Sequence, residues 1–224
     1  SRPTTNLTST LNFEKDNDDW VALDGLEDSL VNTNRSVFLW MRAAGQVNGD
    51  NQVLVAMNSS GTATVCNFGI RTNEELWMYD GGNNRNSGVV VTDGKWHFVG
   101  YTYNEASNET KMYVDGVEVR SYSNGQSLSS TSRISLGQEF DGSSTSDFFD
   151  GEMTEVSIWK EVLDTNDIKA IMTAPIANSH ANYSQLVAYY TANATCGESA
   201  LQLNDFSGNN LHGTASSTSI INID

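Results

Sequence analysis

The chain has 224 residues, of which 38% are hydrophobic and five are tryptophan, so it holds enough apolar material for one sizeable core. Its 28 acidic and 12 basic residues give a formal net charge of −16. That charge disfavours nucleic acids, polyanions and anionic membranes by repulsion, and it favours divalent cations. No apolar stretch approaches the roughly 20 residues that a membrane span needs, so membrane insertion is not expected.

Short segments rich in β-branched and aromatic residues recur along the chain, separated by Gly, Asn, Asp and Ser. This spacing is typical of an antiparallel sandwich or barrel. The clearest hairpin signal is Asp115-Gly116, because this pair supplies the positive φ angles that a two-residue turn requires. The expected strands are 20–23, 36–42, 53–57, 62–70, 75–79, 88–92, 96–103, 111–114, 117–120, 134–136, 154–159 and 186–190.

One short helix is expected after these strands. Asp164 can cap its N-terminus, and Leu163 and Ile168 hold the two positions of a hydrophobic staple. Ile168 and Ile171 lie on one apolar stripe, and Pro175 ends the segment. A lone helix among a dozen strands predicts an all-β sandwich with one helical cover. No linker divides the sequence, so we expect residues 1–224 to form a single domain.

Carboxylates are crowded between Arg133 and Lys160, where six acidic residues occur without a Lys or Arg. Five of them fall in one Gly- and Ser-rich, loop-like stretch: Glu139, Asp141, Asp147, Asp150 and Glu152. Because like charges this close repel one another, these groups must protonate, stay solvated or share a cation. Ca²⁺ suits such a loop, since it accepts about six to eight oxygen ligands in loose geometry. A solvated acidic loop is the alternative.

A second polar segment, residues 48–51, directly precedes the apolar run 53–55 and could contribute to the same metal site. Two cysteines, Cys66 and Cys196, could form one disulfide or remain buried thiols.

Several motifs occur in order along residues 20–172: Trp20-Val-Ala-Leu, Ser36-Val-Phe-Leu-Trp-Met, Asp93-Gly-Lys-Trp96-His97, Met112-Tyr-Val-Asp115-Gly116 and Val156-Ser-Ile-Trp159. Together they resemble the laminin G-like and concanavalin A-like jelly roll, an antiparallel two-sheet sandwich. Within that superfamily the sequence is most similar to pentraxin-like calcium-dependent lectin domains. Gly49-Asp50-Asn51-Gln52-Val53 looks like the pentraxin segment that gives an Asp and an Asn to calcium. Leu136-Gly-Gln-Glu139-Phe140-Asp141 looks like the loop that gives a Glu, a backbone carbonyl and an Asp.

The resemblance implies Ca²⁺ as the cofactor and assigns its ligands. A first ion would take Asp50, Asn51, Glu139, the carbonyl of Phe140, and Asp141. Pentraxins place a second ion beside the first, and Asp147 and Asp150 fall near the positions of its additional ligands. Family members bind ligand oxygens directly on these metals.

The resemblance therefore implies a calcium-dependent, lectin-like module that recognises carbohydrate on a cell surface. A peptide carboxylate could occupy the same metal, so a protein-binding adhesin module is the alternative, and the oligomeric state stays open. The acidic, Asn/Ser/Thr/Gly-rich composition is typical of secreted bacterial modules, in surroundings where calcium is plentiful. We therefore expect an extracellular or cell-surface location, within a secreted or surface adhesin.

An enzyme is not expected, although glycan hydrolases share the jelly roll. Such hydrolases use carboxylates spaced Glu-x-Asp-x-x-Glu or Glu-x-Asp-x-Glu, which places the acids on one face of a strand, and this sequence has no such triplet. It also has no Gly-x-Ser-x-Gly motif. Tyr79, Phe148 and Phe149 could stack on a sugar ring, or the two phenylalanines could anchor the acidic loop to the sheet.

Overall fold

The computed structural model describes residues 9–45, 49–58, 64–196, 201–217 and 220–223. Its strands are β1 Ser9–Phe13, β2 Val21–Ala22, β3 Arg35–Arg42, β4 Gln52–Asn58, β5 Thr64–Ile70, β6 Glu75–Tyr79, β7 Asn84–Val90, β8 His97–Asn104, β9 Glu109–Val114, β10 Val117–Ser123, β11 Arg133–Leu136, β12 Glu139–Asp141, β13 Ser144–Ser146, β14 Gly151–Trp159, β15 Leu186–Cys196, β16 Leu201–Asp205, β17 Gly213–Ala215 and β18 Ile221–Ile223. Its helices are α1 Thr165–Thr173 and the short 3₁₀ turns η1 Lys15–Asn17, η2 Glu27–Leu30 and η3 Tyr183–Gln185.

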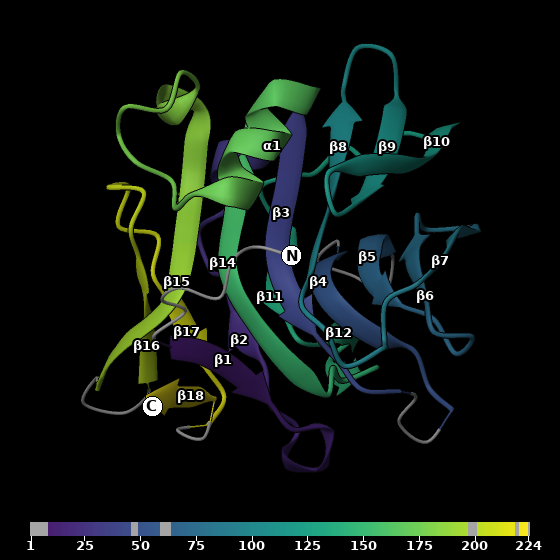
Figure 1. Ribbon diagram of the computed structural model, residues 1–224, viewed down its shortest axis with the longest axis vertical. Coiled ribbons are helices and arrows are strands. Elements are labelled where there is room, and N and C mark those ends of the chain that lie inside the picture. Colours follow the sequence, from purple (N-terminus) through teal and green to yellow (C-terminus); the bar gives the residue numbers. More distant parts are fainter. Residues whose placement is uncertain (1–8, 46–48, 59–63, 197–200, 218–219, 224) are drawn as a thin grey trace.

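Sixteen of the strands hydrogen-bond in one antiparallel sheet that folds back on itself into two layers, and β12 and β13 form a separate two-stranded sheet (Figure 1). The first layer holds β10, β9, β8, β3, β14 and β15, and the second holds β2, β11, β4, β5, β6 and β7. β16 and β17 link the two layers, and β1 pairs with β14 and β18. The predicted antiparallel jelly-roll sandwich is therefore confirmed.

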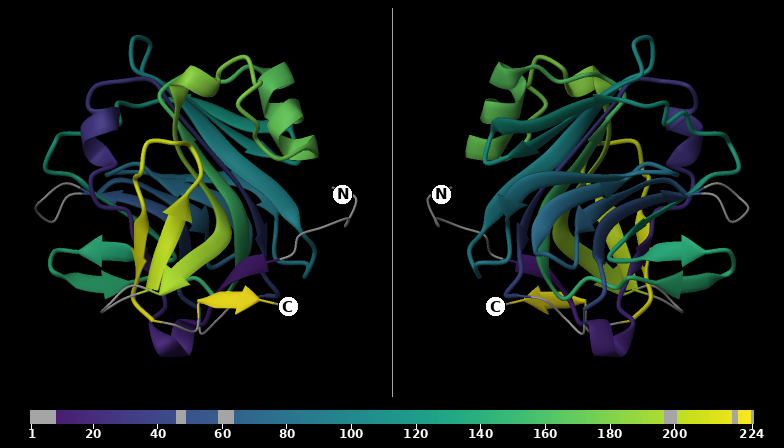
Figure 2. Two further views of the ribbon diagram at one scale, coloured as in Figure 1. Left: turned by 90° about the vertical axis from the view of Figure 1, so that its left-hand side faces the viewer. Right: turned by 90° about the vertical axis from the view of Figure 1, so that its right-hand side faces the viewer.

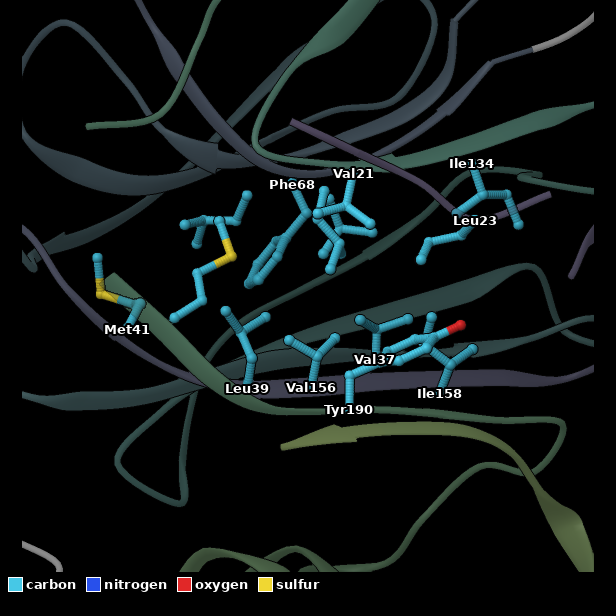
Figure 3. Close-up of a cluster of buried hydrophobic side chains, with 14 of the residues drawn as sticks. Val21, Leu23, Val37, Leu39, Met41, Phe68, Ile134, Val156, Ile158 and Tyr190 are labelled. Atoms are coloured by element: carbon cyan, nitrogen blue, oxygen red, sulfur yellow. The ribbon is translucent and has the colours of Figure 1, made fainter. Parts of the chain in front are cut away.

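The main core lies between the two layers. Leu39, Val156 and Ile158 of the first layer face Phe68 and Ile134 of the second (Figure 3), and all five are buried. Alternate side chains of a strand point to opposite faces, so each strand also presents an outer face. Burial of each large apolar side chain in the core stabilises the fold by about 1.5–3 kcal/mol. The packed core thereby holds the two sheets in one arrangement.

Helix α1 covers the outer face of the first layer, as the lone-helix pattern predicted (Figure 1). The Asp164 carboxylate accepts hydrogen bonds from the backbone N–H groups of Asn166 and Asp167 at 2.7 and 2.9 Å, which confirms the expected N-cap. Leu163 and Ile168 are both buried in the same outer cluster. Helix α1 has nine residues, and none of the described helices is long and apolar enough to cross a membrane.

Two turns show how well local sequence predicted local structure. Asp115 and Gly116 have φ angles of 50° and 77° between β9 and β10, as a two-residue hairpin requires. The acidic stretch, in contrast, is not the simple loop that its composition suggested. Its first part forms the β12–β13 hairpin, which turns at Gly142 with φ 66° and projects from the side of the sandwich (Figure 2).

Strand β7 differs from its expected position at 88–92, since it spans Asn84–Val90. The shift follows from tertiary pairing: Tyr79 pairs with Asn84 and Trp77 with Asn86, so the ladder with β6 extends into a segment rich in Asn. Context of this kind overrides intrinsic strand preference. The pairing matters for function because it brings Asn84 beside two aromatic residues.

Candidate functional site

A hollow of about 390 Å³ lies between strands β5 to β7 and the β12–β13 hairpin. It is lined by Asn51, Thr64, Asn67, Trp77, Tyr79, Gly81, Asn84, Glu139, Asp141 and Asp147. We call it the acidic hollow, because its lining includes three carboxylates and, among the residues the structure describes, neither Lys nor Arg. Its volume lies within the range of small-ligand sites.

Strand alternation places the lining residues of the sheet. On β6, Leu76 and Met78 point into the core, whereas Trp77 and Tyr79 belong to the outer face. On β5, Asn67 lies opposite Tyr79 in the ladder and shares that outer face. The acidic hollow therefore lies on the outer face of the second layer, on the opposite side of the sandwich from helix α1.

Two carboxylates of the acidic hollow, those of Glu139 and Asp147, are partly buried close to other acidic groups. Burial, together with the nearby charges of Asp147 and Asp141, raises the pKa of Glu139 to about 7. Burial also raises the pKa of Asp147, although the Asn51 amide donates to its carboxylate at 3.1 Å and opposes the shift. A cation among these groups would favour their charged forms and remove the repulsion.

Asn67 adds a second, independent feature to the acidic hollow. Its Nδ2 donates a hydrogen bond to the Glu139 carboxylate. The residue is 1% exposed, and its Oδ1 has no hydrogen-bond partner within the described part of the chain. An unpaired buried oxygen is costly, and Asn67 belongs to the lining of the acidic hollow. Sequence reasoning missed Asn67, although a polar residue between Cys66 and Phe68 on an otherwise buried strand was a usable signal.

The acidic hollow brings together four of the seven predicted calcium ligands: Asn51, Glu139, Asp141 and Asp147. The Asp50 carboxylate, 58% exposed, instead forms an ion pair with Lys15 at 2.8 Å. The Phe140 carbonyl accepts a hydrogen bond from Asn58 at 3.2 Å. Asp150 lines a different hollow.

The donor chemistry of the acidic hollow fits calcium. Carboxylate and amide oxygens are the hard ligands that Ca²⁺ takes. Glu139, Asp141 and Asp147 supply carboxylates, and Asn51 and Asn67 supply amides. In the described part of the chain, no three His, Cys, Asp or Glu side chains already form a cluster that could hold a metal ion.

The aromatic residues near the site have different roles. Trp77 and Tyr79 are stacked, with ring centroids 6.4 Å apart and planes inclined by 27°. Trp77 is buried and its Nε1 donates to Asn84 at 2.8 Å, whereas the half-buried Tyr79 can touch a ligand. Phe148 and Phe149 are buried, so they anchor the acidic segment to the sandwich and cannot stack on a sugar.

A second hollow of about 670 Å³ lies where β1 and η1 meet the end of β3 and the start of β14. It is lined by Asn12, Phe13, Glu14, Lys15, Asp16, Arg42, Ala43, Ala44, Gly94, Asp150, Gly151 and Glu152. We call it the N-terminal hollow. Its lining mixes acidic, basic and amide side chains over a floor of small and buried residues.

A family model described as the concanavalin A-like lectin/glucanases superfamily matches residues 15–169. A candidate carbohydrate-binding protein from Bacteroides ovatus superposes with a TM-score of 0.71 at 18% identity, covering 97% of this chain and 59% of that protein. The heptameric SAP-like pentraxin from Limulus polyphemus gives 0.56 at 12% identity, over 76% and 84%. The Ruminococcus gnavus IT-sialidase CBM40 bound to α2,3-sialyllactose gives 0.58 at 9% identity, over 75% and 100%. At these identities the structures show a shared fold.

Proposed function

This chain belongs to the concanavalin A-like lectin/glucanases superfamily, and from that premise we propose that it is a calcium-dependent module that binds carbohydrate on a cell surface. One observation carries the proposal: the acidic hollow combines three carboxylates, the unpaired oxygen of Asn67 and the presented ring of Tyr79 on one outer face. These groups supply the metal ligands, hydrogen-bonding atoms and aromatic surface of a metal-assisted sugar site. We take residues 1–224 as one domain in this proposal.

Calcium would be held by the four grouped ligands Asn51, Glu139, Asp141 and Asp147. Asp50 is near enough to contribute to the raised pKa of Asp147, so it can join the site by leaving Lys15. The Phe140 carbonyl can offer a second lone pair beside its bond from Asn58. Asp150 would have to turn away from the N-terminal hollow to serve a second ion. The bound ion would offer open coordination positions to vicinal sugar hydroxyls.

The rest of the acidic hollow would orient the sugar. The ring of Tyr79 can support the apolar face of a pyranose, and Thr64 and Asn84 supply hydrogen-bonding groups beside it. The described lining contains no basic residue. A sugar that carries a carboxylate would therefore find no ion-pair partner in the acidic hollow other than the bound cation. The arrangement therefore favours an uncharged glycan.

Two other functions could use the same residues. A peptide carboxylate at the ion would make the protein a protein-binding adhesin module. Glycan hydrolysis is favoured by the raised pKa of Glu139, about 7, with Asp141 and Asp147 in the same hollow, since a carboxyl that stays protonated near neutral pH can act as a general acid. Binding ranks first, because β12 offers only Glu139 and Asp141 where hydrolases of this fold use three spaced acids.

We also propose an extracellular or cell-surface location, within a secreted or surface adhesin. A net charge of −16 and an acidic hollow suit surroundings rich in divalent cations. Extracellular calcium modules have dissociation constants of about 10⁻⁴–10⁻³ M, so a site with few charged ligands can be occupied there.

A combined glycan and peptide array, probed in Ca²⁺ and in EDTA, tests the proposal. The test variant is Asp141→Asn, and the matched control is Asp28→Asn, an exposed acid of η2 that lines neither hollow. We expect glycans to be retained only in Ca²⁺, by the wild type and the control but not by Asp141→Asn. Binding to peptides alone would replace the lectin function with the adhesin alternative. Release of reducing sugar would overturn the non-catalytic proposal.

A further inference from the structure

We propose that the N-terminal hollow is a second sugar subsite, so that the protein binds an extended, uncharged glycan chain across both hollows. This inference rests on the proposed function and adds the length and charge of the ligand. The N-terminal hollow, at about 670 Å³, is larger than the acidic hollow and within the usual size of ligand sites.

Residues 147–150, which we call the ridge, connect the linings of the two hollows. Asp147 lines the acidic hollow and Asp150 the N-terminal hollow, and the span of three residues limits their Cα separation to about 11 Å. Asn51 also lines the acidic hollow, while its neighbour Asp50 pairs at 2.8 Å with Lys15, which lines the N-terminal hollow. One oligosaccharide can therefore cross the ridge and reach both hollows.

The ridge is held firmly in place. The buried Gln52 accepts a hydrogen bond from the backbone N–H of Asp150 at 3.1 Å and donates to the carbonyl of Gly45 at 3.4 Å. The backbone N–H of Val53 donates to the carbonyl of Asp147 at 2.9 Å. Because the ridge is ordered by these bonds, the spacing of the two hollows is set before a glycan binds, which lowers the entropic cost of engaging both.

The floor of the N-terminal hollow is close-packed. The buried rings of Phe13 and Phe149 meet edge to face with centroids 5.9 Å apart. A Cβ at Gly151 would lie 2.3 Å from the carbonyl oxygen of Arg42 and 2.8 Å from the Phe149 ring, so only glycine fits there. The hollow is therefore a formed surface of the fold.

The polar groups of the N-terminal hollow suit sugar hydroxyls. The carboxylates of Asp16 and Asp150 have no hydrogen-bond or ion-pair partner in the part of the chain that the structure describes. The Asn12 amide, which donates to the Glu14 carboxylate at 3.3 Å, keeps a second N–H in the same lining. Hydroxyl groups can donate to the carboxylates and accept from the amide. Four acids against two bases leave an excess of negative charge, which disfavours carboxylated or sulfated sugars.

Calorimetry with neutral oligosaccharide ladders tests the inference. The probes are maltose-, cellulose-, xylan- and mannan-derived chains from disaccharide to octasaccharide, titrated in Ca²⁺. The test variants are Asp16→Ala, which removes an acceptor, and Ala44→Gln, which fills part of the hollow. Asp28→Ala is the matched control, and thermal melts confirm that each variant folds. In the wild type we expect affinity to rise with chain length until the chain spans the ridge.

In Asp16→Ala, long chains should lose about fivefold in affinity, the worth of one hydrogen bond, while disaccharides bind as before. Equal affinity for short and long chains, or an undiminished length effect in both test variants, would overturn this inference and leave the proposed function standing. Tighter binding of 3′-sialyllactose than of lactose would overturn the charge preference. Failure of every glycan, with Ca²⁺ present, would end both proposals.

Discussion

Asn67 on β5 donates a hydrogen bond to the carboxylate of Glu139 on β12, joining two residues that are 72 positions apart in the sequence. The bond ties the outer face of the second sheet to the projecting hairpin. It also leaves Asn67 Oδ1 unpaired while Glu139 keeps a raised pKa of about 7. The acidic hollow therefore holds both an acceptor without a donor, Asn67 Oδ1, and a carboxylate with a raised pKa, that of Glu139.

Calcium should stabilise the wild-type protein, because the ion binds the folded state preferentially. At a free calcium concentration about 100 times the dissociation constant, the gain in unfolding free energy should be about 2.7 kcal/mol. Asp141→Asn should remove most of this gain, since it deletes one of the grouped carboxylates. Thermal melts with and without EDTA measure the effect, and Asp28→Asn should behave as the wild type. A calcium-dependent shift that Asp141→Asn leaves intact would refute the assigned ligands.

In EDTA, Glu139→Gln should make the protein more stable at pH 8. The folded-state pKa of Glu139, about 7, lies above the ordinary 4.5, so the native state holds this proton more tightly than the unfolded state does. Stability from this group is therefore present below about pH 4.5 and is lost as the pH rises through 7. Because the side chain is partly exposed, we expect a gain of only about 1 kcal/mol.

Urea unfolding of both proteins at pH 5 and pH 8 measures the effect of Glu139→Gln. The advantage of the glutamine variant should shrink at pH 5, and the same variant should bind calcium more weakly. A variant less stable than the wild type at pH 8 in EDTA would show that the carboxylate is compensated in the native state.

The stability of the fold should also depend on pH through His97. Its Nδ1 lies 2.9 Å from the Asp115 carboxylate and its Nε2 lies 3.1 Å from that of Asp93, which is also paired with Lys95. These carboxylates raise the pKa of His97, with Asp115 the larger cause. The contribution is therefore present below the ordinary pKa of 6.5 and is lost as the pH rises through the folded value.

Asp115→Asn should thus cost more stability at pH 5.5 than at pH 8.5. The difference should be about 0.5 kcal/mol, because the pair is partly solvated. Chemical denaturation at the two pH values, with His97→Gln as the reference, tests it. Equal losses of stability at both pH values would mean that the Asp115 side chain stabilises the fold only by accepting the hydrogen bond from the Phe98 backbone N–H.

Asp205→Ala should be among the most destabilising single changes outside the core. Its carboxylate, on a residue only 9% exposed, accepts hydrogen bonds from the backbone N–H groups of Tyr189, Ser207 and Leu211 at 2.8–3.0 Å, and from the Ser207 hydroxyl. Loss of the acceptors leaves buried donors unpaired at about 1–3 kcal/mol each, so we expect a loss of about 3 kcal/mol or more. Asp205→Asn, which keeps one oxygen, should lose less in the same denaturation assay.

The elements with strong local signals were predictable from sequence. The Asp115-Gly116 turn requires only positive φ angles, and the helix after Asp164 requires only its cap and staple; both are interactions within a few residues. The sequence predicts a loop where the β12–β13 hairpin forms, because its turn at Gly142 lies among Ser and Asp residues that show no strand alternation. Its pairing is set by the short ladder from Glu139 to Ser146.

The sequence by itself determined the sandwich class, the lone capped helix and the crowding of carboxylates after Arg133, because period, turn chemistry and charge are local properties. Only the tertiary structure decided which of those carboxylates share a hollow. Asn67 and Tyr79 reach Glu139 because β5 and β6 pair and the hairpin lies against their outer face. The side chains of Asp50 and Asp150 are not part of its lining, because Asp50 pairs with Lys15 and Asp150 lines the N-terminal hollow. Such meetings depend on strand order and packing between distant segments, which no local pattern encodes.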